Sequence, residues 1–356
     1  INILTLLLAS FLIAETVNTF AANEDCAHQA AFGVEHLAKA YSYPNKIKNL
    51  LKELNLPQGE ALLEKLDLFR LNYLLHNIGE PTLEIRRLKN RAIEMLYAYS
   101  NEVMQNAKVK RVSEMKRNSK TGYDLTAISP ENYDYGVGTN LAYRVEFESA
   151  DGKAFQGLFK PDMDTLLPAP SNREVFAFEF ARAMGIPNVP HTITRSIKID
   201  GTNLKGSLQF WVDRTDTSKR KYRRSDRLMA FDATISQRDR HRGNLLITDE
   251  GIEVWIDHGL SGSVKDIRGI NFAAGIEAQA DLGRISPAQL ERIALNQKFT
   301  ETEINELLTR RRLQMYFGAR QEHFVVNGEF WKSGGTALRL FESEPRKYLG
   351  RLNENT

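Results

Sequence analysis

The segment from Asn244 to Asp257 constrains the fold of this chain more than any other. Two short apolar runs, Leu245-Leu246-Ile247 and Ile252-Glu253-Val254-Trp255-Ile256, flank Thr248-Asp249-Glu250-Gly251, an acidic turn that contains glycine. Two such runs around such a turn predict a β-hairpin. A hairpin brings its ends together, so we expect Asn244 and Asp257 to lie at the same end.

Polar side chains at and before this hairpin suggest a chemistry. A phosphoryl-transfer site needs a carboxylate that orients a nucleophile, and an amide and a second carboxylate that hold Mg²⁺ on nucleotide phosphates. Asp239, Asn244 and Asp257 supply that set. The alternative is a polar surface loop, because Asp, Asn and Gly are ordinary turn formers. Turn chemistry does not explain polar residues at both ends of an apolar hairpin, so the set favours a functional site.

The bulk composition sets outer limits. The chain has 356 residues, of which 42% are hydrophobic, so it can bury a sizeable core in one large domain or two. Its net charge of +3 is too small to indicate nucleic acid as a partner. The single cysteine, Cys26, excludes an intrachain disulfide framework and a cysteine-based zinc site.

Residues 1–22 are apolar and end in the small residues of Thr19-Phe20-Ala21-Ala22. This pattern is typical of a secretory signal peptide, although the basic n-region is missing and the chain does not begin with Met. A membrane anchor and a buried helix are the alternatives, but Glu15 and Asn18 break the run, which is short for a bilayer span. We expect an exported or secreted protein (periplasm, extracellular space or secretory lumen) with no transmembrane span in the mature chain.

Residues 23–124 are expected to form a helical N-terminal domain. Helices are predicted over 27–43, from Pro44 to about 56, along the apolar face from 62 to 75, and from about 82 to 107. Pro57-Gln58-Gly59 is expected to separate two of them. The polar, basic stretch 108–124 is expected to be a linker or exposed loop, with the domain boundary at 124.

The rest of the chain predicts an α+β fold. Within residues 125–215, strands are predicted over 141–147, 154–160, 192–199 and 206–212, with a helix over 172–184 that ends at Gly185 and a turn at Asp200-Gly201. Residues 216–356 are expected to be mainly helical, with helices over 226–236, from Ser286-Pro287, and from a Thr300–Glu303 capping box to about 324. The acidic motif at Asp239 falls at the start of this second lobe.

Further side chains fit a nucleotide site. Gly136 and Gly138 form a glycine loop whose amides could approach phosphates, although an ordinary turn is the better reading of that loop alone. Lys160 ends a strand and could reach phosphates, or it is an edge-strand lysine. Glu174 would hold Lys160, with Glu179 as the rival, or it simply suits a helix N-terminus.

The backbone at 209–212, two histidines and a basic run each allow more than one interpretation. The backbone at Gln209, Trp211 and Val212 could bind an adenine edge, with Trp211 or Phe210 against the ring, but plain core is the better interpretation of each of these two aromatic side chains. His241 could orient Asp239, stabilise transferred charge, or be structural; His241 and His258 lack the partners of a zinc site. The basic run 218–224 reads as a solvated loop, with an acidic substrate, a lipid headgroup or nucleic acid as alternatives.

Taken in order, these segments resemble the kinase-like superfamily, and within it the phosphoinositide 3-/4-kinase-like group with its bacterial and HipA-type members. The segments that carry the resemblance are Asp239-Arg240-His241 with Asn244, Ile256-Asp257-His258-Gly259, Gly157 to Pro161, Arg173 to Phe178, Val189 to Thr192, and Gly206 to Gln209. It covers about residues 130–265. In eukaryotic protein kinases, by contrast, histidine and arginine precede the first aspartate and phenylalanine follows the second.

The resemblance implies a two-lobed protein-kinase-like fold and an ATP- and Mg²⁺-dependent phosphotransferase. It implies that Lys160 contacts phosphates, Glu174 anchors it, Asp239 orients the acceptor, and Asn244 and Asp257 bind Mg²⁺. A protein hydroxyl is the favoured acceptor and a lipid headgroup the second. A catalytically inactive pseudokinase that serves as a binding module, a lipid kinase and an AMP transferase on the same fold are the alternatives.

Overall fold

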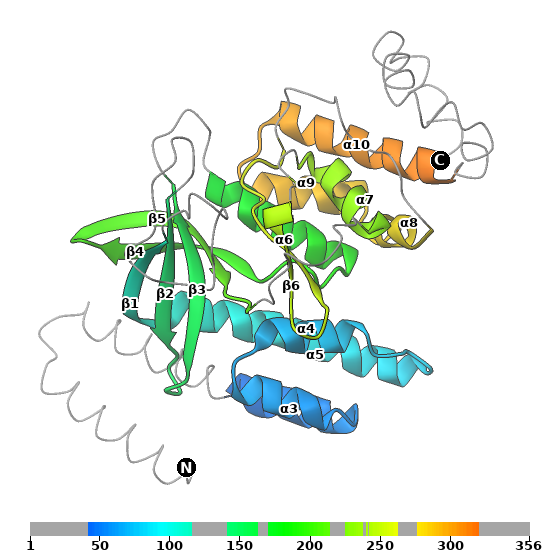
Figure 1. Cartoon of the computed structure of the whole chain (residues 1–356). Helices are drawn as coiled ribbons and strands as arrows, with labels where there is room; N and C mark the ends of the chain where they lie inside the picture. The colour runs from blue at the N-terminus through cyan, green and yellow to red at the C-terminus, as the bar shows by residue number, and fades with distance from the viewer. Residues whose placement is uncertain are drawn as a thin grey trace, which may run out of the picture. The chain divides into compact units, whose positions relative to one another are not determined.

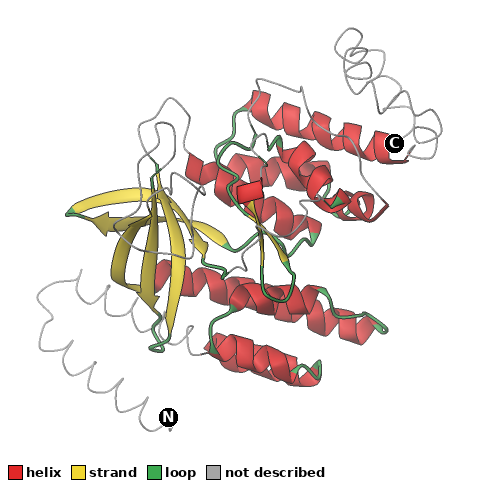
Figure 2. Cartoon of the chain, viewed as in Figure 1, coloured by secondary structure: helices red, strands yellow, loops and turns green. Residues whose placement is uncertain are grey.

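The computed structural model of the chain describes residues 42–115, 141–162, 170–213, 225–237, 240, 242–262 and 276–319 (Figure 1). Its elements are a helix over 42–53, α3 (Pro57–Glu64), α4 (Leu68–His76), α5 (Leu83–Asn106), β1 (Lys108–Met115), β2 (Ala142–Glu148), β3 (Ala154–Pro161), α6 (Pro170–Met184), β4 (Thr192–Ile199), β5 (Thr202–Phe210), α7 (Asp226–Ile235), η1 (Arg242–Asn244), β6 (Leu245–Ile247), β7 (Glu253–Trp255), α8 (Ile276–Gly283), α9 (Pro287–Asn296) and α10 (Glu301–Ala319). Figure 2 separates the helices from the strands by colour.

The chain divides into two compact units. The helical unit comprises, of the described residues, 42–68, 78–108 and 148–154. The sheet unit comprises 69–77, 109–115, 141–147 and the described residues from 155 onward. The predicted domain boundary at 124 and the predicted signal peptide over 1–22 lie outside the described residues.

The helix over 42–53 and α5 confirm two of the predicted helices, whereas the run 62–75, which we expected to form one helical face, is divided between α3 and α4 at Leu66, whose φ is +55°. In α5, Thr82 caps the N-terminus by accepting a hydrogen bond from the Ile85 amide, at 3.2 Å. The buried positions of α5 recur at helical spacing: Ala92, Ile93, Leu96, Tyr97, Val103 and Met104. Pro57, which we expected to separate two helices, is itself the first residue of α3.

A five-stranded sheet in the order β1-β2-β3-β5-β4 carries Lys160 on β3. β5 pairs antiparallel with both β3 and β4, with Lys160 opposite Ser207 and Thr192 opposite Gln209. The Asp200-Gly201 turn that joins β4 to β5 has φ of 48° and 83°, the left-handed conformation of a two-residue hairpin turn. The predicted turn is therefore confirmed.

Two strand predictions need correction. Residues 108–115 are not the expected linker but β1, an edge strand whose side chains are largely exposed or half-buried. Charged residues suit an edge because they discourage pairing with other chains, which is why the stretch reads as a loop. β5 begins at Thr202 and ends at Phe210 rather than spanning 206–212. Its start was missed because Leu204 is the one apolar residue among its first four.

The helices of the sheet unit form around a buried aromatic core. α6 packs on β4, β5 and α9, and α10 packs on α7, α8 and α9. The Phe180 ring lies 5.8 Å from that of Phe231, which in turn lies 5.4 Å from Trp255. The predicted capping box of Thr300 with Glu303 is present, and the predicted helix start at Ser286 is closed by a capping box with Gln289. Together with the sheet, these helices confirm the α+β class.

The hairpin predicted between Asn244 and Asp257 is formed by β6 and β7. Leu245 pairs with Trp255, and the Ile256 amide donates to the Asn244 carbonyl at 3.2 Å. Asn244 and Asp257 therefore lie at the same end, as predicted. One face of the hairpin is buried in a small cluster of Phe69, Leu246, Val254 and Ile256, with Val212 and Ile252 beside it. α4 thus supplies part of the hairpin's packing.

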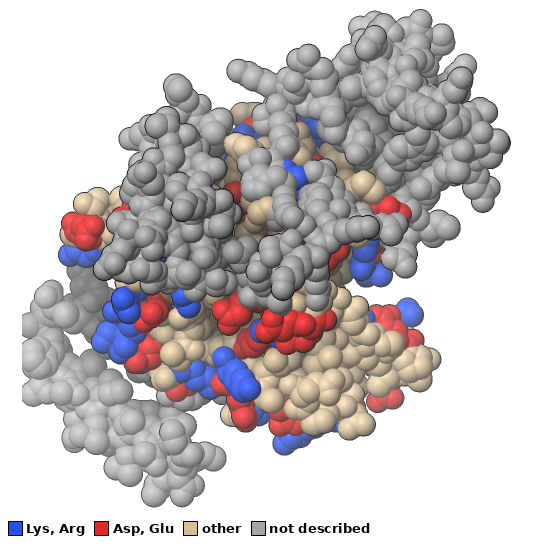
Figure 3. All heavy atoms as spheres, in the orientation of Figure 1, with Lys and Arg blue, Asp and Glu red and all other residues tan. Residues whose placement is uncertain are grey.

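Acidic and basic side chains lie next to one another on the face that Figure 3 shows. Over the part of the chain that the structure describes, no helix has the length and apolarity to cross a membrane.

Gly206 sets the spacing between β5 and β3 at Lys160. A Cβ at Gly206 would lie 2.2 Å from the Lys160 carbonyl oxygen and 2.6 Å from Pro161 Cα, which are backbone atoms that cannot turn aside. We expect Gly206→Ala to lower the free energy of unfolding by about 3 kcal/mol, as overpacked cores do. Chemical denaturation checks this, with Gly79→Ala as control because a Cβ there would have no atom within 4 Å. Equal stability of the two variants would contradict the close approach.

Candidate active site

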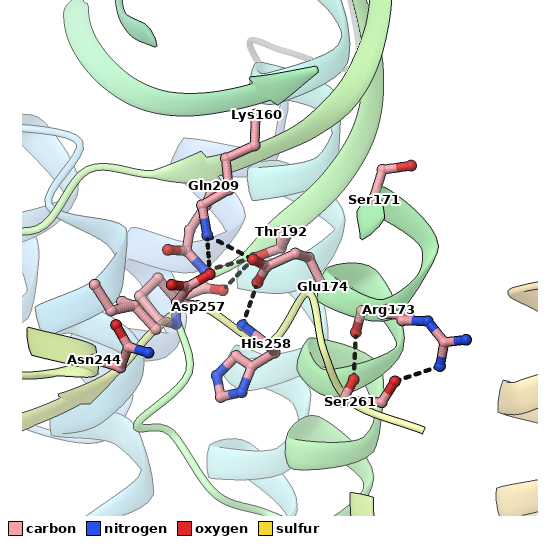
Figure 4. Close-up of polar contacts among 12 residues, drawn as sticks. Lys160, Ser171, Arg173, Glu174, Thr192, Gln209, Asn244, Asp257, His258 and Ser261 are labelled. Carbon is pink, nitrogen blue, oxygen red and sulfur yellow. Dashed lines mark hydrogen bonds and ion pairs between the residues drawn. The ribbon is translucent and has the colours of Figure 1, made fainter. Parts of the chain in front are cut away.

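Lys160 joins two carboxylates that come from distant parts of the sequence. Its Nζ lies 2.6 Å from Oε1 of Glu174 on α6 and 2.9 Å from Oδ1 of Asp257, just after β7 (Figure 4). The lysine side chain is 17% exposed, the Glu174 side chain 3% and the Asp257 side chain 38%. The arrangement is thus closed at Glu174 and open to solvent at Asp257.

Both carboxylate oxygens of Glu174 accept hydrogen bonds. Oε1 accepts from Lys160, and Oε2 accepts from the backbone amide of His258 at 3.0 Å. Glu174 therefore fixes the lysine and the residue after Asp257 at the same time. Glu179, the rival candidate, is paired instead with Arg182 on its own helix at 3.5 Å.

Lys160 and the two carboxylates beside it stabilise one another's ionised forms. Burial lowers the pKa of Lys160, but the Asp257 and Glu174 carboxylates outweigh it and raise that pKa above its usual value. The Lys160 ammonium holds the pKa of Asp257 below its usual value against the opposing effect of burial. One positive and two negative charges leave an excess negative charge, and Asp257 is the member that solvent reaches. The group can therefore attract a cation.

The backbone at Asp257 is held in an uncommon conformation. Its φ is +62°, in the left-handed region that Asp and Asn tolerate better than most residues. The Gln237 side-chain amide donates to the Asp257 carbonyl oxygen at 2.5 Å. Gln237, which the sequence did not single out, thus stabilises the conformation that aims the carboxylate.

Arg240 is the largest addition that the structure makes to the site. Its side chain is 1% exposed and forms a bidentate pair with Asp232 of α7, whose two oxygens lie 2.9 and 3.0 Å from Nη2 and Nε. Nη1 donates to the carbonyls of Asn244 and Ile256, at 2.6 and 2.8 Å. Nη2 also lies 3.2 Å from Nδ1 of His258. The five N–H donors of a guanidinium all have partners here.

His258 is fully buried and neutral. Because arginine only donates, Nδ1 must accept from Arg240, and Nε2 then carries the proton that it donates to the Trp255 carbonyl at 3.2 Å. Burial, followed by the positive charge of Arg240, lowers the pKa of His258 well below its usual value. Both nitrogens are thus engaged within the protein, so His258 is a structural residue.

Asn244 and Asp257 fit a magnesium site. Asn244 is buried, lies beside Asp257 and is joined to it through the hydrogen bond to Ile256 (Figure 4). Mg²⁺ prefers hard oxygen ligands and takes one or two protein carboxylates, with phosphate and water completing its shell. Among the described residues no group of three His, Cys, Asp or Glu gathers as it would around a metal ion. One carboxylate and one amide remain as the candidate ligands.

The residues expected to border a nucleotide base lie at the end of β5. The Gln209 side chain is buried and donates to Thr192 Oγ1 at 3.0 Å, and the Trp211 amide donates to the Gln156 carbonyl at 3.0 Å. The Trp211 ring is covered by the Arg144 guanidinium, 4.6 Å from its centre. Val212 follows the last paired residue of β5 and packs beside the hairpin cluster.

Several predicted site residues are not placed. Asp239, His241, Gly136 and Gly138 lie outside the described residues, as does the basic run 218–224. The structure therefore brings together Lys160, Glu174, Asn244 and Asp257 and leaves the acceptor side of the site as a prediction. Arg240 stood in the quoted motif, but two of its five donors bind backbone carbonyls, and the others bind Asp232 and His258. The one usable signal in the sequence was Asp232, an acid among the apolar residues of α7.

No protein-family model and no curated protein matches the chain. Among solved structures it is similar to hydra Fam20 with a sugar, at 15% identity and a TM-score of 0.45, over 65% of this chain and 90% of that one. It is also similar to the Golgi casein kinase, once with Mn and ADP bound, at 12% identity and a TM-score of 0.42, over 63% of this chain and 76% of that one. The roles of the site residues rest on the geometry above.

Removal of Arg240 should strand the buried Asp232 carboxylate. We expect Arg240→Met to lower the free energy of unfolding by about 3–5 kcal/mol, and Asp232→Leu added to it to restore part of that loss. Urea denaturation measures both. Arg86→Met is the control, because its ion pair with Glu80 is half exposed and contributes under about 1 kcal/mol. A double variant as unstable as the sum of the singles would contradict the pairing.

Two neutral histidines, His258 buried and His191 half-buried, should make stability depend on pH. Burial lowers the pKa of His191 to about 3, and that of His258 is also lowered, so only the unfolded chain takes up protons just below pH 6.5. The free energy of unfolding should be flat above pH 7 and fall below pH 6.5, by up to about 1.4 kcal/mol per pH unit for each histidine. Denaturation between pH 5 and 7.5 measures the slope. His258→Gln should reduce it, and an unchanged slope would count against a neutral His258.

Proposed function

We propose that this protein is an ATP- and Mg²⁺-dependent phosphotransferase with a two-lobed kinase-like fold. The observation that carries the proposal is Lys160 held between Glu174 and Asp257, at 2.6 and 2.9 Å. A lysine fixed by a helix glutamate, next to an acid that is open to solvent, is what phosphate positioning beside a metal ion requires. The branch of the superfamily stays as the sequence resemblance suggests, phosphoinositide 3-/4-kinase-like or HipA-type.

Each residue has a distinct role in this proposal. Lys160 binds phosphate oxygens, and Glu174 keeps its ammonium in place. Asp257 and Asn244 hold Mg²⁺, which neutralises phosphate charge when it is bound. Gln237 and Arg240 would support these ligands without touching the metal ion, since they donate to the backbone carbonyls of Asp257 and Asn244. Catalysis then consists mainly of positioning and of stabilising charge.

The remaining roles come from the sequence. Asp239 orients the acceptor hydroxyl, and His241 orients Asp239 or stabilises charge on the transferred group. Gly136 and Gly138 cover the phosphates, and the backbone at Gln209, Trp211 and Val212 borders the adenine. A protein hydroxyl is the proposed acceptor. Residues 1–22 suggest that the protein acts after export, in a periplasm, an extracellular space or a secretory lumen.

The test is transfer from labelled ATP. Purified protein is incubated with MgATP labelled at the α- or the γ-phosphate, together with host-cell proteins or lipid vesicles, and the products are identified by mass spectrometry. We expect γ-phosphate on protein hydroxyls, lost in Asp239→Ala and in Asp257→Asn. Transfer of the α-label would indicate an AMP transferase, and labelled lipid a lipid kinase. Absence of transfer to protein, lipid or the enzyme itself would refute the proposal.

Two glutamates on α6 provide a matched pair for this assay. Glu174→Gln removes the charge that holds Lys160, so we expect turnover to fall about 10- to 100-fold, as for other residues that support a metal–phosphate site. Glu179→Gln changes the same helix by the same atoms but removes the charge that pairs with Arg182 and not the one that holds Lys160, so turnover should stay at the wild-type level. Equal effects of the two substitutions would exclude the proposed role of Glu174.

A further inference from the structure

Arg173 and Glu174 are consecutive residues of α6, and both bond the stretch Asp257–Gly262. Glu174 accepts from the His258 amide, near the start of the stretch, at 3.0 Å. Arg173 donates through Nη1 to the Ser261 carbonyl, near its end, and the Ser261 hydroxyl donates back to the Arg173 carbonyl at 3.3 Å (Figure 4). Two consecutive residues of α6 thus bond this stretch at His258 and at Ser261.

Arg173 is itself held by the start of α10. Its Nη2 lies 2.6 Å from Oε1 of Glu303, and its guanidinium lies 5.3 Å from the centre of the Phe299 ring. The two charged side chains are only 11% and 14% exposed, so water weakens their pairing less than at an open surface. The guanidinium therefore reaches oxygens on two separate segments at once, which its planar fork allows and a lysine cannot reproduce.

Glu303 does two jobs with its two oxygens. Oε2 accepts from the amide and the hydroxyl of Thr300, at 2.8 and 2.9 Å, and so closes the capping box of α10. Oε1 is left for Arg173. The first turn of α10 is thereby connected through one carboxylate to the helix that carries Glu174.

The far end of the stretch has no room to shift. Gly262 has a φ of +73°, and a Cβ there would lie 2.3 Å from the Phe299 ring and 2.8 Å from Arg173 Nη1. Its amide donates to the carbonyl of Ile235, at the end of α7, at 2.6 Å. The backbone that follows Asp257 is therefore fixed by α6 and α7, and Arg173 is the side chain common to the contacts at Ser261 and Gly262.

We propose that Arg173 is a positioning residue for Asp257: with Glu303 it locks the stretch Asp257–Gly262 onto α6, so that the carboxylate and the Lys160–Glu174 pair keep one geometry. Loss of the Arg173 side chain would remove its bond to the Ser261 carbonyl and leave the 3.3 Å bond from the Ser261 hydroxyl to the backbone of residue 173, while Glu174 still holds His258. Asp257 would then lie less accurately beside Asn244. The inference rests on the proposed function only in naming a cation as what Asp257 holds.

The experiment separates this role from helix stability. Glu303→Gln removes the charge facing Arg173 but should keep the cap, because Gln289 closes the capping box of α9 in this same chain. Arg173→Met and Arg173→Lys remove the two-segment fork, and Arg292→Met, at an exposed arginine of α9, is the control. The first readout is Mn²⁺ affinity in the presence of a non-hydrolysable ATP analogue. The second is amide hydrogen exchange of residues 258–262.

We expect Arg173→Met and Arg173→Lys to weaken Mn²⁺ binding about 10-fold, the lower end of the range for residues that orient metal ligands. Glu303→Gln should act in the same direction, and adding it to Arg173→Met should cost little more, because the two residues share one interaction. Amides 258–262 should exchange faster in each variant, while α9 amides and the Arg292→Met protein stay unchanged.

Two results would overturn the inference. One is unchanged Mn²⁺ affinity in Arg173→Met; the other is faster exchange that is uniform along the chain, which would mean a general loss of stability. If the wild type binds no Mn²⁺ with the analogue, the proposed function fails, and the exchange of residues 258–262 still decides whether Arg173 locks the stretch. The failures of the two proposals are therefore distinguishable.

Discussion

The geometry of the candidate site depends on one buried cation, the Arg240 guanidinium. A buried donor without a partner costs free energy, and a charged one costs more, so a buried arginine is tolerated only where each N–H is satisfied. Asp232, the Asn244 and Ile256 carbonyls and His258 satisfy them from α7, the two ends of the hairpin and the segment beyond it. Displacing any of these segments would break a bond to a buried charge.

This arrangement separates two charge systems that lie close together. Arg240 is neutralised locally by Asp232, which leaves the Lys160, Glu174 and Asp257 group with its own excess negative charge. His258 stands between them: its ring bonds Arg240, and its amide bonds Glu174. Because the ring is neutral, His258 bonds both the Arg240–Asp232 pair and the Lys160 group without adding charge near Asp257. The inner system supports the backbone, and the outer system remains available for a ligand.

The sequence was most informative where side chains define local geometry. The hairpin, the helix start at Ser286 and the capping box at Thr300 follow from spacing and turn chemistry, whereas the pairing of Lys160 with Glu174 was implied by the family resemblance. β1 was missed because a polar edge strand resembles a loop, and burial on a sheet is a tertiary property. Gln237 was missed as a support because it binds a backbone carbonyl, which every residue carries and no motif records. Arg240 was missed because two of its bonds are to such carbonyls and its pairing with Asp232 is a tertiary contact.

The backbone conformation at position 257 restricts which amino acids can stand there, independently of the chemistry of the site. Its φ of +62° reverses the hand of the chain between two bonded neighbours, Ile256 on the hairpin side and His258 on the α6 side. Only glycine, asparagine and aspartate adopt that hand at low cost. Of these three, aspartate alone carries a charge. The backbone conformation and the negative charge thus favour the same amino acid for independent reasons. Asparagine or glycine would keep the conformation but lose the charge, and glutamate would keep the charge but not suit the conformation.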